Sequence, residues 1–449
     1  MFVTAQTFKN TLRNLRSNFP GVISNDSRGQ RPGDSVTRSS QQLTSDCLLS
    51  AAVFVCRLHT KKFMKKNILL ISGTRPEIIK LAPLYHALRD ANWAKVQWLH
   101  TGQHSDMADQ ILACFDIVPD IKLARAGTSL LEFGVGCRQQ LESVMTSQAW
   151  SMVIVQGDTE SAFQGAITAF YNRIPVAHVE AGLRTYNLGR PFPEEGLRQI
   201  ISRITQLHFP PTARSRAALL AEGIADEAIH MTGNTVIDAQ KWTCAHRGVS
   251  RKVQGRGHML VTAHRRENWG NDMAEICHAI AEIARQQPDL QILFPVHLNP
   301  VVQGPVNSIL AGIANVTLTA PLDYTQMQQA LADAWLVLTD SGGLQEEAPT
   351  FGVPVLVLRD ETERPEAVES GCAMLIGATR SAIVSAVARL TAEPSLHLAM
   401  ARAGNPFGDG TASAQIVRTL ARVLMPLEPV ISDSLTKHSV QSVDVAVAA

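Results

Sequence analysis

The sequence predicts an α/β protein with two Rossmann-like domains and an active site in the cleft between them. The chain has 449 residues, which is more than one hydrophobic core usually holds. From residue 67 onward, short apolar runs alternate with helix-like segments, as in parallel sheets with crossover helices. A polar stretch at 243–257 interrupts the alternation and is the predicted linker. We therefore place the first domain at 64–240, the second at 241–403, and a helix that packs back on the first domain at 404–426.

The individual elements are predicted from apolar runs bounded by turn residues. In the first half, strands are expected at 67–72, 96–101, 151–156, 175–179, 206–209 and 229–232, and helices at 77–91, 106–115, 129–148, 160–172 and 212–222. In the second half, strands are expected at 259–263, 290–296, 315–319, 335–339, 354–358 and 373–376. Pro76 suits the first turn of the helix after the first strand, where a backbone N–H has no partner.

The two ends of the chain differ from the rest. Residues 1–63 contain nine Lys or Arg, three Asp and no Glu, a composition that also occurs in organellar transit peptides. We favour the alternative that translation starts at Met64, directly before the first strand, and expect the fold not to need this leader. Residues 427–449 are predicted to be a disordered tail.

Composition excludes several classes of function. A net charge of +1 and 5% aromatic residues argue against a nucleic-acid surface. The seven cysteines are scattered and never form a Cys-x-x-Cys pair, which predicts a reducing compartment, no disulfide framework and no zinc site. The longest apolar candidate, 48–55, is far shorter than the roughly 18 residues of a membrane span. We expect a cytoplasmic protein with no metal and no nucleic-acid or membrane partner.

The segment 336–347 carries the strongest local signal. It reads as an apolar strand, a turn containing Ser341, Gly342 and Gly343, and a helix start with Glu346 and Glu347. The unpaired N–H groups and positive dipole of a helix start attract anions, and glycine lets a phosphate approach the backbone. A carboxylate in the first helical turn can reach ribose hydroxyls beside that phosphate. Alone, the segment fits an ordinary strand-to-helix turn equally well.

Other predicted strands also end in charged residues. These are Arg75 and Lys80 after the first strand, Asp158 after 151–156, Glu180 and Arg184 after 175–179, and His264 and Arg265 after 259–263. Ligands of open α/β sheets bind beyond the carboxyl ends of the strands. Together these strand ends predict a site for an anionic ligand.

Two missing motifs narrow the ligand. The first strand-turn-helix lacks the Gly-x-Gly-x-x-Gly of dinucleotide-binding domains, and the chain lacks a P-loop. A nucleotide sugar held by its diphosphate remains, for either glycosyl transfer or chemistry on the sugar. Asp158, Glu180 and Glu194 supply the acid/base groups that a proton transfer on the sugar needs. The structural alternative is that Asp158 caps a helix and Glu194 pairs with Arg198 four residues later.

A set of motifs resembles the non-hydrolysing bacterial UDP-N-acetylglucosamine 2-epimerases, in order, from about residue 64 to about residue 425. They are Gly-Thr-Arg-Pro-Glu at 73–77, Gly-Gln-His at 102–104, Gly-Asp-Thr at 157–159, His-Val-Glu-Ala-Gly-Leu-Arg-Thr at 178–185, Pro-Glu-Glu at 193–195, Thr-Gly-Asn-Thr-Val-Ile-Asp at 232–238, His-Arg-Arg-Glu at 264–267, Pro-Val-His-Leu-Asn-Pro at 295–300, Asp-Ser-Gly-Gly at 340–343 with Gln-Glu-Glu-Ala-Pro at 345–349, and Thr-Glu-Arg-Pro-Glu-Ala at 362–367.

The resemblance implies a GT-B-like fold and a reaction without cofactor. The family removes the C2 proton, expels UDP by anti elimination and adds UDP back to a 2-acetamidoglucal, which gives UDP-N-acetylmannosamine for polysaccharide biosynthesis. By motif match, the diphosphate ligands would be Arg75, His264, Ser341, Gly342 and Gly343, with Glu347 on the ribose and Lys80 and Arg364 completing the set. Asp158, Glu180 and Glu194 would be the acid/base groups, and His264 would stabilise the departing UDP.

Some positions depart from the family pattern. Ser105 follows Gln103 and His104 where many members have Arg, and Leu197 replaces an Asn, near the place where a second, activating UDP-N-acetylglucosamine binds. Met327 stands where several members have an aromatic residue near the base. We expect a homodimer from the resemblance. A GT-B glycosyltransferase, an epimerase of a modified UDP-N-acetylhexosamine, a hydrolysing relative and a nucleotide-sugar sensor are the alternatives.

Overall fold

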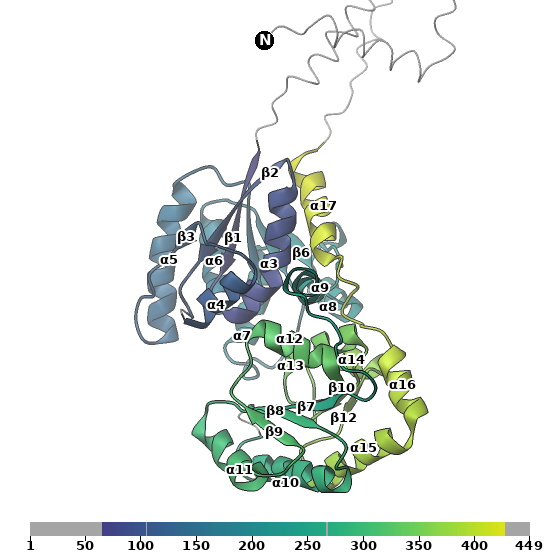
Figure 1. The fold of residues 1–449 in the computed structure, drawn as a ribbon. Coiled ribbons are helices and arrows are strands. Elements are labelled where there is room, and N and C mark those ends of the chain that lie inside the picture. The colour runs from purple at the N-terminus through teal and green to yellow at the C-terminus, as the bar shows by residue number, and fades with distance from the viewer. Residues whose placement is uncertain (1–64, 105, 266–267, 427–449) are drawn as a thin grey trace, which may run out of the picture. The chain divides into compact units, whose positions relative to one another are not determined.

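The computed structural model describes residues 65–104, 106–265 and 268–426. The predictions for residues 1–63, for Ser105 and for residues 427–449 lie outside the described part. In Figure 1 the described elements run from β1 to α17.

The first sheet contains six parallel strands in the order β3-β2-β1-β4-β5-β6. Their bounds are Lys66–Ser72 for β1, Ala94–His100 for β2, Ile121–Lys122 for β3, Met152–Gln156 for β4, Val176–Val179 for β5 and Leu207–Phe209 for β6. The side chains of β1 alternate between the faces, so that Ile68 and Leu70 enter one hydrophobic cluster and Leu69 and Ile71 enter another. Both faces are buried, as parallel sheets require.

Helices cover both faces of this sheet. The cluster around Ile68 includes residues of α3 (Arg75–Asp90), α4 (Asp106–Cys114), α9 (Thr235–Arg247) and α17 (Ala412–Leu424). The cluster around Leu69 includes residues of α5 (Leu130–Thr146), α6 (Glu160–Tyr171) and α7 (Glu194–Ile204). The sequence also forms α8 (Ala213–Ala221) and a short 3-10 turn, η1 (Asp226–Ala228). Figure 1 shows α17 beside α3, which it contacts although it comes last in the described chain.

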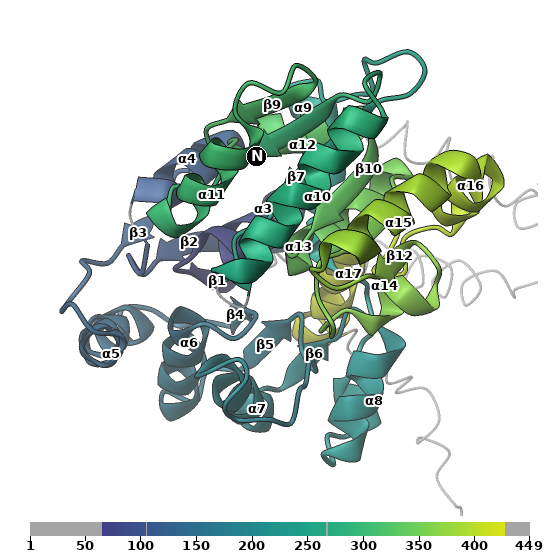
Figure 2. The same ribbon diagram turned by 90° about the horizontal axis from the view of Figure 1, so that it is seen from below.

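The second sheet repeats this arrangement with six parallel strands in the order β12-β11-β10-β7-β8-β9. The strands are β7 (His258–Thr262), β8 (Ile292–Pro295), β9 (Val316–Thr319), β10 (Ala334–Thr339), β11 (Val355–Val357) and β12 (Ala373–Leu375). One face packs on α10 (Asn271–Gln286), α11 (Pro300–Leu310), α15 (Arg380–Ala392) and α16 (Pro394–Arg402), and α10 and α15 lie side by side in Figure 2. The other face packs on α12 (Tyr324–Asp333), α13 (Gly342–Glu347), η3 (Ala348–Phe351) and α14 (Pro365–Glu369).

Both sheets have the strand order of a Rossmann domain, which confirms the predicted fold class. In each sheet the order reverses between the first and the fourth strand, β1 and β4 in one and β7 and β10 in the other. The loops after two such strands diverge to opposite faces and leave a crevice that binds ligands. Each of these four strands is followed by residues that the sequence singles out: Arg75 after β1, Asp158 after β4, His264 after β7 and Ser341 after β10.

Three element predictions were wrong or incomplete. Residues 229–232 do not form a strand. Ile229 makes only an isolated bridge to His208, and Pro210, which directly follows β6, has no N–H to extend the ladder. Strand β3 was not predicted, since two residues carry too little periodicity. The first residues of the predicted linker at 243–257 complete α9, which ends at the left-handed Gly248.

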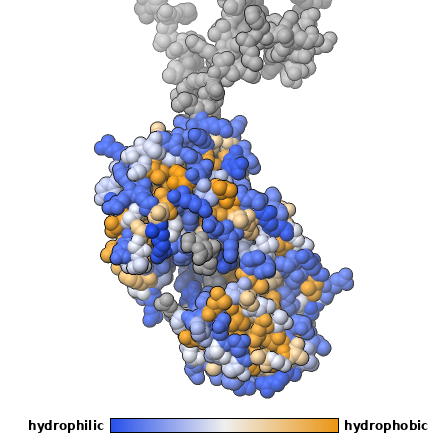
Figure 3. Space-filling view, turned by 60° about the vertical axis from the view of Figure 1, so that its left-hand side comes forward, coloured by the Kyte–Doolittle hydropathy of each residue, from blue (hydrophilic) through white to orange (hydrophobic). Residues whose placement is uncertain are grey.

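Within the part of the chain that the structure describes, no helix is both long and apolar enough to cross a bilayer. The face in Figure 3 carries mostly hydrophilic side chains, with hydrophobic side chains in separate groups.

Candidate functional site

A cavity of about 570 Å³ collects the ligand-binding residues that the resemblance predicted. Its lining includes Arg75, Lys80, His264, Ser341, Gly342, Gly343, Glu347 and Arg364, which come from four separate segments. Pro295, Leu322, Tyr324 and Met327 form apolar parts of the wall. The structure therefore brings cations, helix-start N–H groups and an apolar surface to one place, which is a suitable combination for a nucleoside diphosphate.

The turn after β1 places Arg75 at the first position of α3. Gly73 packs so closely there that a Cβ would lie 1.9 Å from Ser161 Oγ. The buried carboxylate of Glu77 accepts hydrogen bonds from the N–H groups of Gly73 at 3.0 Å and Thr74 at 2.6 Å, and from the Thr159 hydroxyl at 2.6 Å. Burial raises the pKa of Glu77 to about 7. The sequence reasoning missed Glu77, although Thr-x-x-Glu before a helix is a capping signal.

A buried network of charges joins the two domains. Lys80 Nζ lies 2.5 Å from Glu180 Oε1 in the first domain and 3.5 Å from Glu346 Oε2 in the second. Arg364 Nε donates to Glu346 Oε1. Burial alone would lower the pKa of Lys80, but the carboxylates of Glu180 and Glu346 outweigh it and raise this pKa. Lys80 therefore carries a positive charge at the edge of the ligand cavity.

Glu180 sits in a left-handed backbone conformation directly after β5, with φ of 63°. Its N–H donates to Phe209 O at 3.1 Å, and its carboxylate accepts hydrogen bonds from Gln156, Lys80 and Asn234. Burial on its own would raise the pKa of Glu180, but Lys80 and Arg364 outweigh it and hold the pKa below its usual range. A strained backbone held by this many donors is typical of a functional position.

Asp158 pairs with Arg198, and this corrects one expectation. Arg198 Nη2 lies 2.7 Å from Asp158 Oδ2 and its Nη1 lies 3.5 Å from Glu195, whereas the sequence suggested a pair with Glu194. Asp158 follows β4 and Arg198 lies in α7, 40 residues later in the chain, so i,i+4 spacing cannot reveal this contact. Burial raises the pKa of Asp158, Arg198 opposes this, and Glu180 and Glu194 add to the rise.

The two neighbouring glutamates of α7 have different surroundings. Glu195 is fully buried and accepts hydrogen bonds from the N–H groups of Thr185 and Tyr186, each at 3.0 Å, so it holds the loop after β5. Glu194 is half-buried, and its carboxylate forms no hydrogen bond or ion pair with another described residue. Of the two, Glu194 is the one whose carboxylate remains available to a ligand.

His264 is oriented by Asp340, a residue that the sequence reasoning treated only as part of a turn. Asp340 is fully buried, and its Oδ2 accepts hydrogen bonds from the N–H groups of His264 and Arg265, both at 2.8 Å. His264 Nδ1 lies 3.2 Å from Asp340 Oδ1, and its ring stacks on His297 with centroids 6.0 Å apart. Burial lowers the pKa of His264, and Asp340 opposes that effect.

The start of α13 presents the predicted Ser-Gly-Gly segment. Ser341 precedes the helix and its N–H donates to Thr339 Oγ1 at 2.9 Å, while Gly342 and Gly343 begin the first turn. At the end of the helix, the Glu347 carboxylate accepts a hydrogen bond from Gln328. Burial raises the pKa of Glu347 to about 7. A carboxyl group with this pKa can either accept or donate a hydrogen bond to a ribose hydroxyl near neutral pH.

The candidate activator residues lie beside the turn after β1. Gln103 Oε1 accepts hydrogen bonds from the N–H and hydroxyl of Ser161, at 3.1 and 2.6 Å, and the His104 N–H donates to Gly73 O at 2.9 Å. The next residue, Ser105, lies outside the described part. Burial lowers the pKa of His104, with Arg125 adding to the effect.

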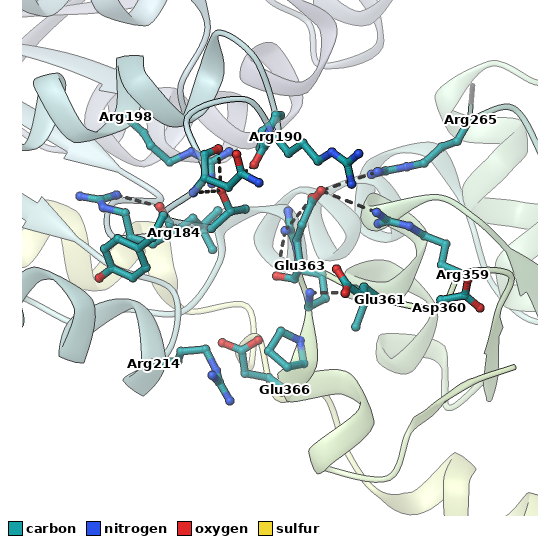
Figure 4. A pocket seen from close by; sticks show the side chains of 18 of the residues that line it. Arg184, Arg190, Arg198, Arg214, Arg265, Arg359, Asp360, Glu361, Glu363 and Glu366 are labelled. Carbon is teal, nitrogen blue, oxygen red and sulfur yellow. Dashed lines mark hydrogen bonds and ion pairs between the residues drawn. The ribbon is translucent and has the colours of Figure 1, made fainter. Parts of the chain in front are cut away.

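A second and larger cavity, of about 1280 Å³, shares Arg265, Glu363 and Arg364 with the first. Figure 4 shows Glu363 directed at Arg265 and Arg359, with distances of 3.6 and 3.9 Å between the charged atoms. Arg184, which the sequence placed among the charged residues at strand ends, lies 2.6 Å from Glu222 and lines this larger cavity rather than the smaller one. Among the described residues, no group of three His, Cys, Asp or Glu side chains is arranged to hold a metal ion.

The chain matches the family model described as UDP-N-acetylglucosamine 2-epimerase over residues 86–421. The UDP-N-acetylglucosamine 2-epimerase of Escherichia coli K12 is 44% identical over 368 residues, which cover 79% of this chain and 98% of that protein. The enzyme of that name from Campylobacter jejuni is 41% identical over 376 residues, covering 80% of this chain and 98% of the relative.

Solved structures agree with this match. The UDP-GlcNAc 2-epimerase of Neisseria meningitidis, solved with bound UDP-GlcNAc, is 39% identical with a TM-score of 0.74 and covers 79% of this chain and all of that chain. The Methanocaldococcus jannaschii enzyme, in complex with UDP-GlcNAc and UDP, is 32% identical with a TM-score of 0.65 and covers 80% of this chain and 99% of that chain. MurG of Acinetobacter baumannii, 15% identical with a TM-score of 0.50, shares the fold alone. With a family model matched over most of its described residues and relatives matched over nearly their whole length, the chain belongs to the UDP-N-acetylglucosamine 2-epimerase family.

Proposed function

We propose that this protein interconverts UDP-N-acetylglucosamine and UDP-N-acetylmannosamine by elimination and re-addition of UDP. The observation that carries the proposal is the position of Lys80. It contacts the Glu180 carboxylate at 2.5 Å, and it lines the cavity together with Arg75, His264 and the start of α13. A group that can take up a proton is therefore adjacent to groups that can hold a diphosphate. The names and bound ligands of the relatives support the same substrate.

In the first half-reaction, a carboxylate removes the proton at C2 while the C1–O bond breaks. The electron pair of the C2–H bond becomes the C1–C2 double bond of 2-acetamidoglucal, and UDP leaves with the electrons of the C1–O bond. In the second half-reaction, UDP attacks C1 and a carboxylic acid delivers a proton to the other face of C2. Nothing is oxidised or reduced. The base then releases its proton to solvent and the acid takes one up, so that the proton balance closes over the cycle.

The two half-reactions need a base and an acid on different faces of the sugar. Opposite pKa shifts support such a division, because burial raises the pKa of Asp158 while Lys80 and Arg364 hold that of Glu180 low. We therefore assign Asp158 as the carboxyl group that more readily carries a proton, and Glu180 as the carboxyl group that is ionised. Glu194, with an unpaired carboxylate beside Asp158, is the third acid/base candidate.

Charge develops on the leaving diphosphate as the C1–O bond breaks. Arg75, His264 and the N–H groups at Ser341, Gly342 and Gly343 line the cavity where this charge would appear. Donors fixed before the reaction stabilise such charge without reorganising. Asp340 fixes the loop that carries His264, so it would stabilise a protonated imidazole beside the diphosphate.

The test is a proton NMR time course with UDP-N-acetylglucosamine in deuterated water. We expect UDP-N-acetylmannosamine with deuterium at C2, little free UDP, and a loss of turnover of at least about 100-fold in Glu180→Gln and in Asp158→Asn. UDP should still bind both variants. Free N-acetylmannosamine with stoichiometric UDP would instead identify a hydrolase, and an undeuterated substrate would contradict the elimination. Full activity in both variants would overturn the acid/base assignment.

A further inference from the structure

Asn234 lies between the carboxylates of the two domains. Its side chain is buried, and its Nδ2 lies 3.1 Å from Glu180 Oε1 and 3.2 Å from Glu346 Oε2. An amide nitrogen carries two hydrogens, so one donor is available for each carboxylate. Lys80 contacts the same two carboxylates, so that Lys80 is a charged donor and Asn234 a neutral donor to the same pair.

The orientation of this amide is fixed by its other contacts. Asn234 Oδ1 accepts a hydrogen bond from the N–H of Val236 at 3.0 Å, which caps the start of α9. The backbone N–H of Asn234 donates to Phe407 O at 2.7 Å. A flipped amide would direct its oxygen at two carboxylates and its NH₂ at the N–H of Val236. Both hydrogens of the amide are therefore committed to Glu180 and Glu346.

Helix capping alone does not require asparagine at this position. Ser, Thr and Asp cap helices about as well, since the cap needs only an acceptor. Serine or threonine would bring a single short O–H donor, and aspartate would place a third negative charge beside Glu180 and Glu346. Asparagine is the residue of this group that combines the cap with two donors.

We propose that Asn234 is a positioning residue for the proton transfer at C2, which holds the Glu180 carboxylate in its reactive orientation. The inference rests on the proposed function. Lys80 lines the ligand cavity, so a bound diphosphate competes with Glu180 for its ammonium group. Asn234 and Gln156 then remain as donors to Glu180. Neutral donors keep a carboxylate oriented while weakening its basicity less than a paired cation does.

The first experiment compares Asn234→Ser with the matched control Asn299→Ser. Asn299 caps α11 in the same way, with Oδ1 3.0 Å from the N–H of Val301, and donates to neither carboxylate. Both substitutions keep a hydroxyl cap. We expect kcat for C2 deuterium exchange to fall about 10- to 100-fold in Asn234→Ser, the value of a hydrogen bond to a charged group, with KM little changed. Asn299→Ser should stay within about twofold of the wild type, and equal kcat values in the two folded variants would overturn the proposal.

The second experiment reads the Glu180 carboxyl group directly and does not depend on turnover. In protein labelled with carbon-13 at the glutamate carboxyls, the Glu180 signal is assigned by its loss in Glu180→Gln. Asn234→Asp should raise the pKa of Glu180, because it replaces a donor to the carboxylate with a negative charge. An unchanged pKa would overturn the positioning role even in an active enzyme. If Asn234→Asp raises the pKa of Glu180 but the wild type does not convert UDP-N-acetylglucosamine, the proposed function would be contradicted and the contact with Glu180 established.

Discussion

Glu77 is a buried carboxyl group that holds the turn after β1. It accepts two backbone hydrogen bonds and one from Thr159, so it connects the turns after β1 and β4. Its pKa of about 7 means that burial outweighs these donors. The ionisation of Glu77 therefore makes the stability of this turn depend on pH.

The folded pKa of Glu77 lies above its unfolded value of 4.5, so the folded state binds the proton more tightly. The stabilisation is complete below pH 4.5 and is lost as the pH rises through about 7. Glu77→Gln keeps an oxygen for the N–H groups of Gly73 and Thr74 and an NH₂ for Thr159. We expect the unfolding free energy of the wild type to fall by roughly 1–3 kcal/mol more than that of the variant between pH 5 and 8. Parallel curves in urea unfolding would contradict this.

At the scale of elements, the turns at the ends of β1, β4, β7 and β10 do most to build the site. Each comes at a point where the strand order reverses, and each carries at least one predicted ligand or acid/base residue. The turn after β1 is the tightest, because Gly73 is packed against Ser161 in α6 and Thr101 after β2. Any side chain at this position must displace the turn that carries Arg75.

Gly73→Ala tests this close contact, with Gly304→Ala as its control. A Cβ on Gly73 would lie 1.9 Å from Ser161 Oγ and 2.3 Å from Thr101 Oγ1, while a Cβ on Gly304 in α11 meets nothing within 4 Å. We expect Gly73→Ala to lose roughly 2–3 kcal/mol of stability and to bind UDP more weakly. Gly304→Ala should change the stability by less than about 1 kcal/mol, since alanine favours a helix but a Cβ is disfavoured directly before Pro305. Thermal unfolding and UDP titration measure both, and equal effects would contradict the packing argument.

At the scale of the whole molecule, buried polar contacts and ring packing join the two domains. Lys80, Glu180, Asn234, Glu346 and Arg364 form the polar part, and Tyr324 of α12 packs on Phe115 with ring centroids 5.6 Å apart. The polar part also borders the ligand cavity. Under the proposed function, a bound diphosphate would therefore act on the contacts that hold the domains together.

Lys80→Met measures the strength of this junction. The substitution leaves two buried carboxylates without their shared cation, with side-chain exposures of 6% for Glu180 and 2% for Glu346. We expect a loss of about 3 kcal/mol in urea unfolding, as for other broken buried ion pairs. Lys122→Met is the control, because its pair with Asp109 is more than half exposed and should contribute less than about 1 kcal/mol. Similar losses in the two variants would show that the junction is not held by charge.

The sequence by itself determined the local elements and the residues at their ends. Apolar runs bounded by turns predicted most strands. The motifs at 73–77 and 340–343 placed Arg75 after the first strand and the Ser-Gly-Gly segment at a helix start, as the structure has them. Both are properties of consecutive residues, whose backbone hydrogen bonds and glycine conformations depend on local sequence.

Only the tertiary structure decided which of these residues meet. Arg198 pairs with Asp158 rather than Glu194, Asp340 orients the loop of His264, and Asn234 reaches both Glu180 and Glu346. These partners lie far apart in the chain, and Asp340 meets His264 because β7 adjoins β10. Strand order arises from packing the whole sheet and not from the pattern of any one strand, so the contacts that tune the candidate site could not be predicted from local sequence.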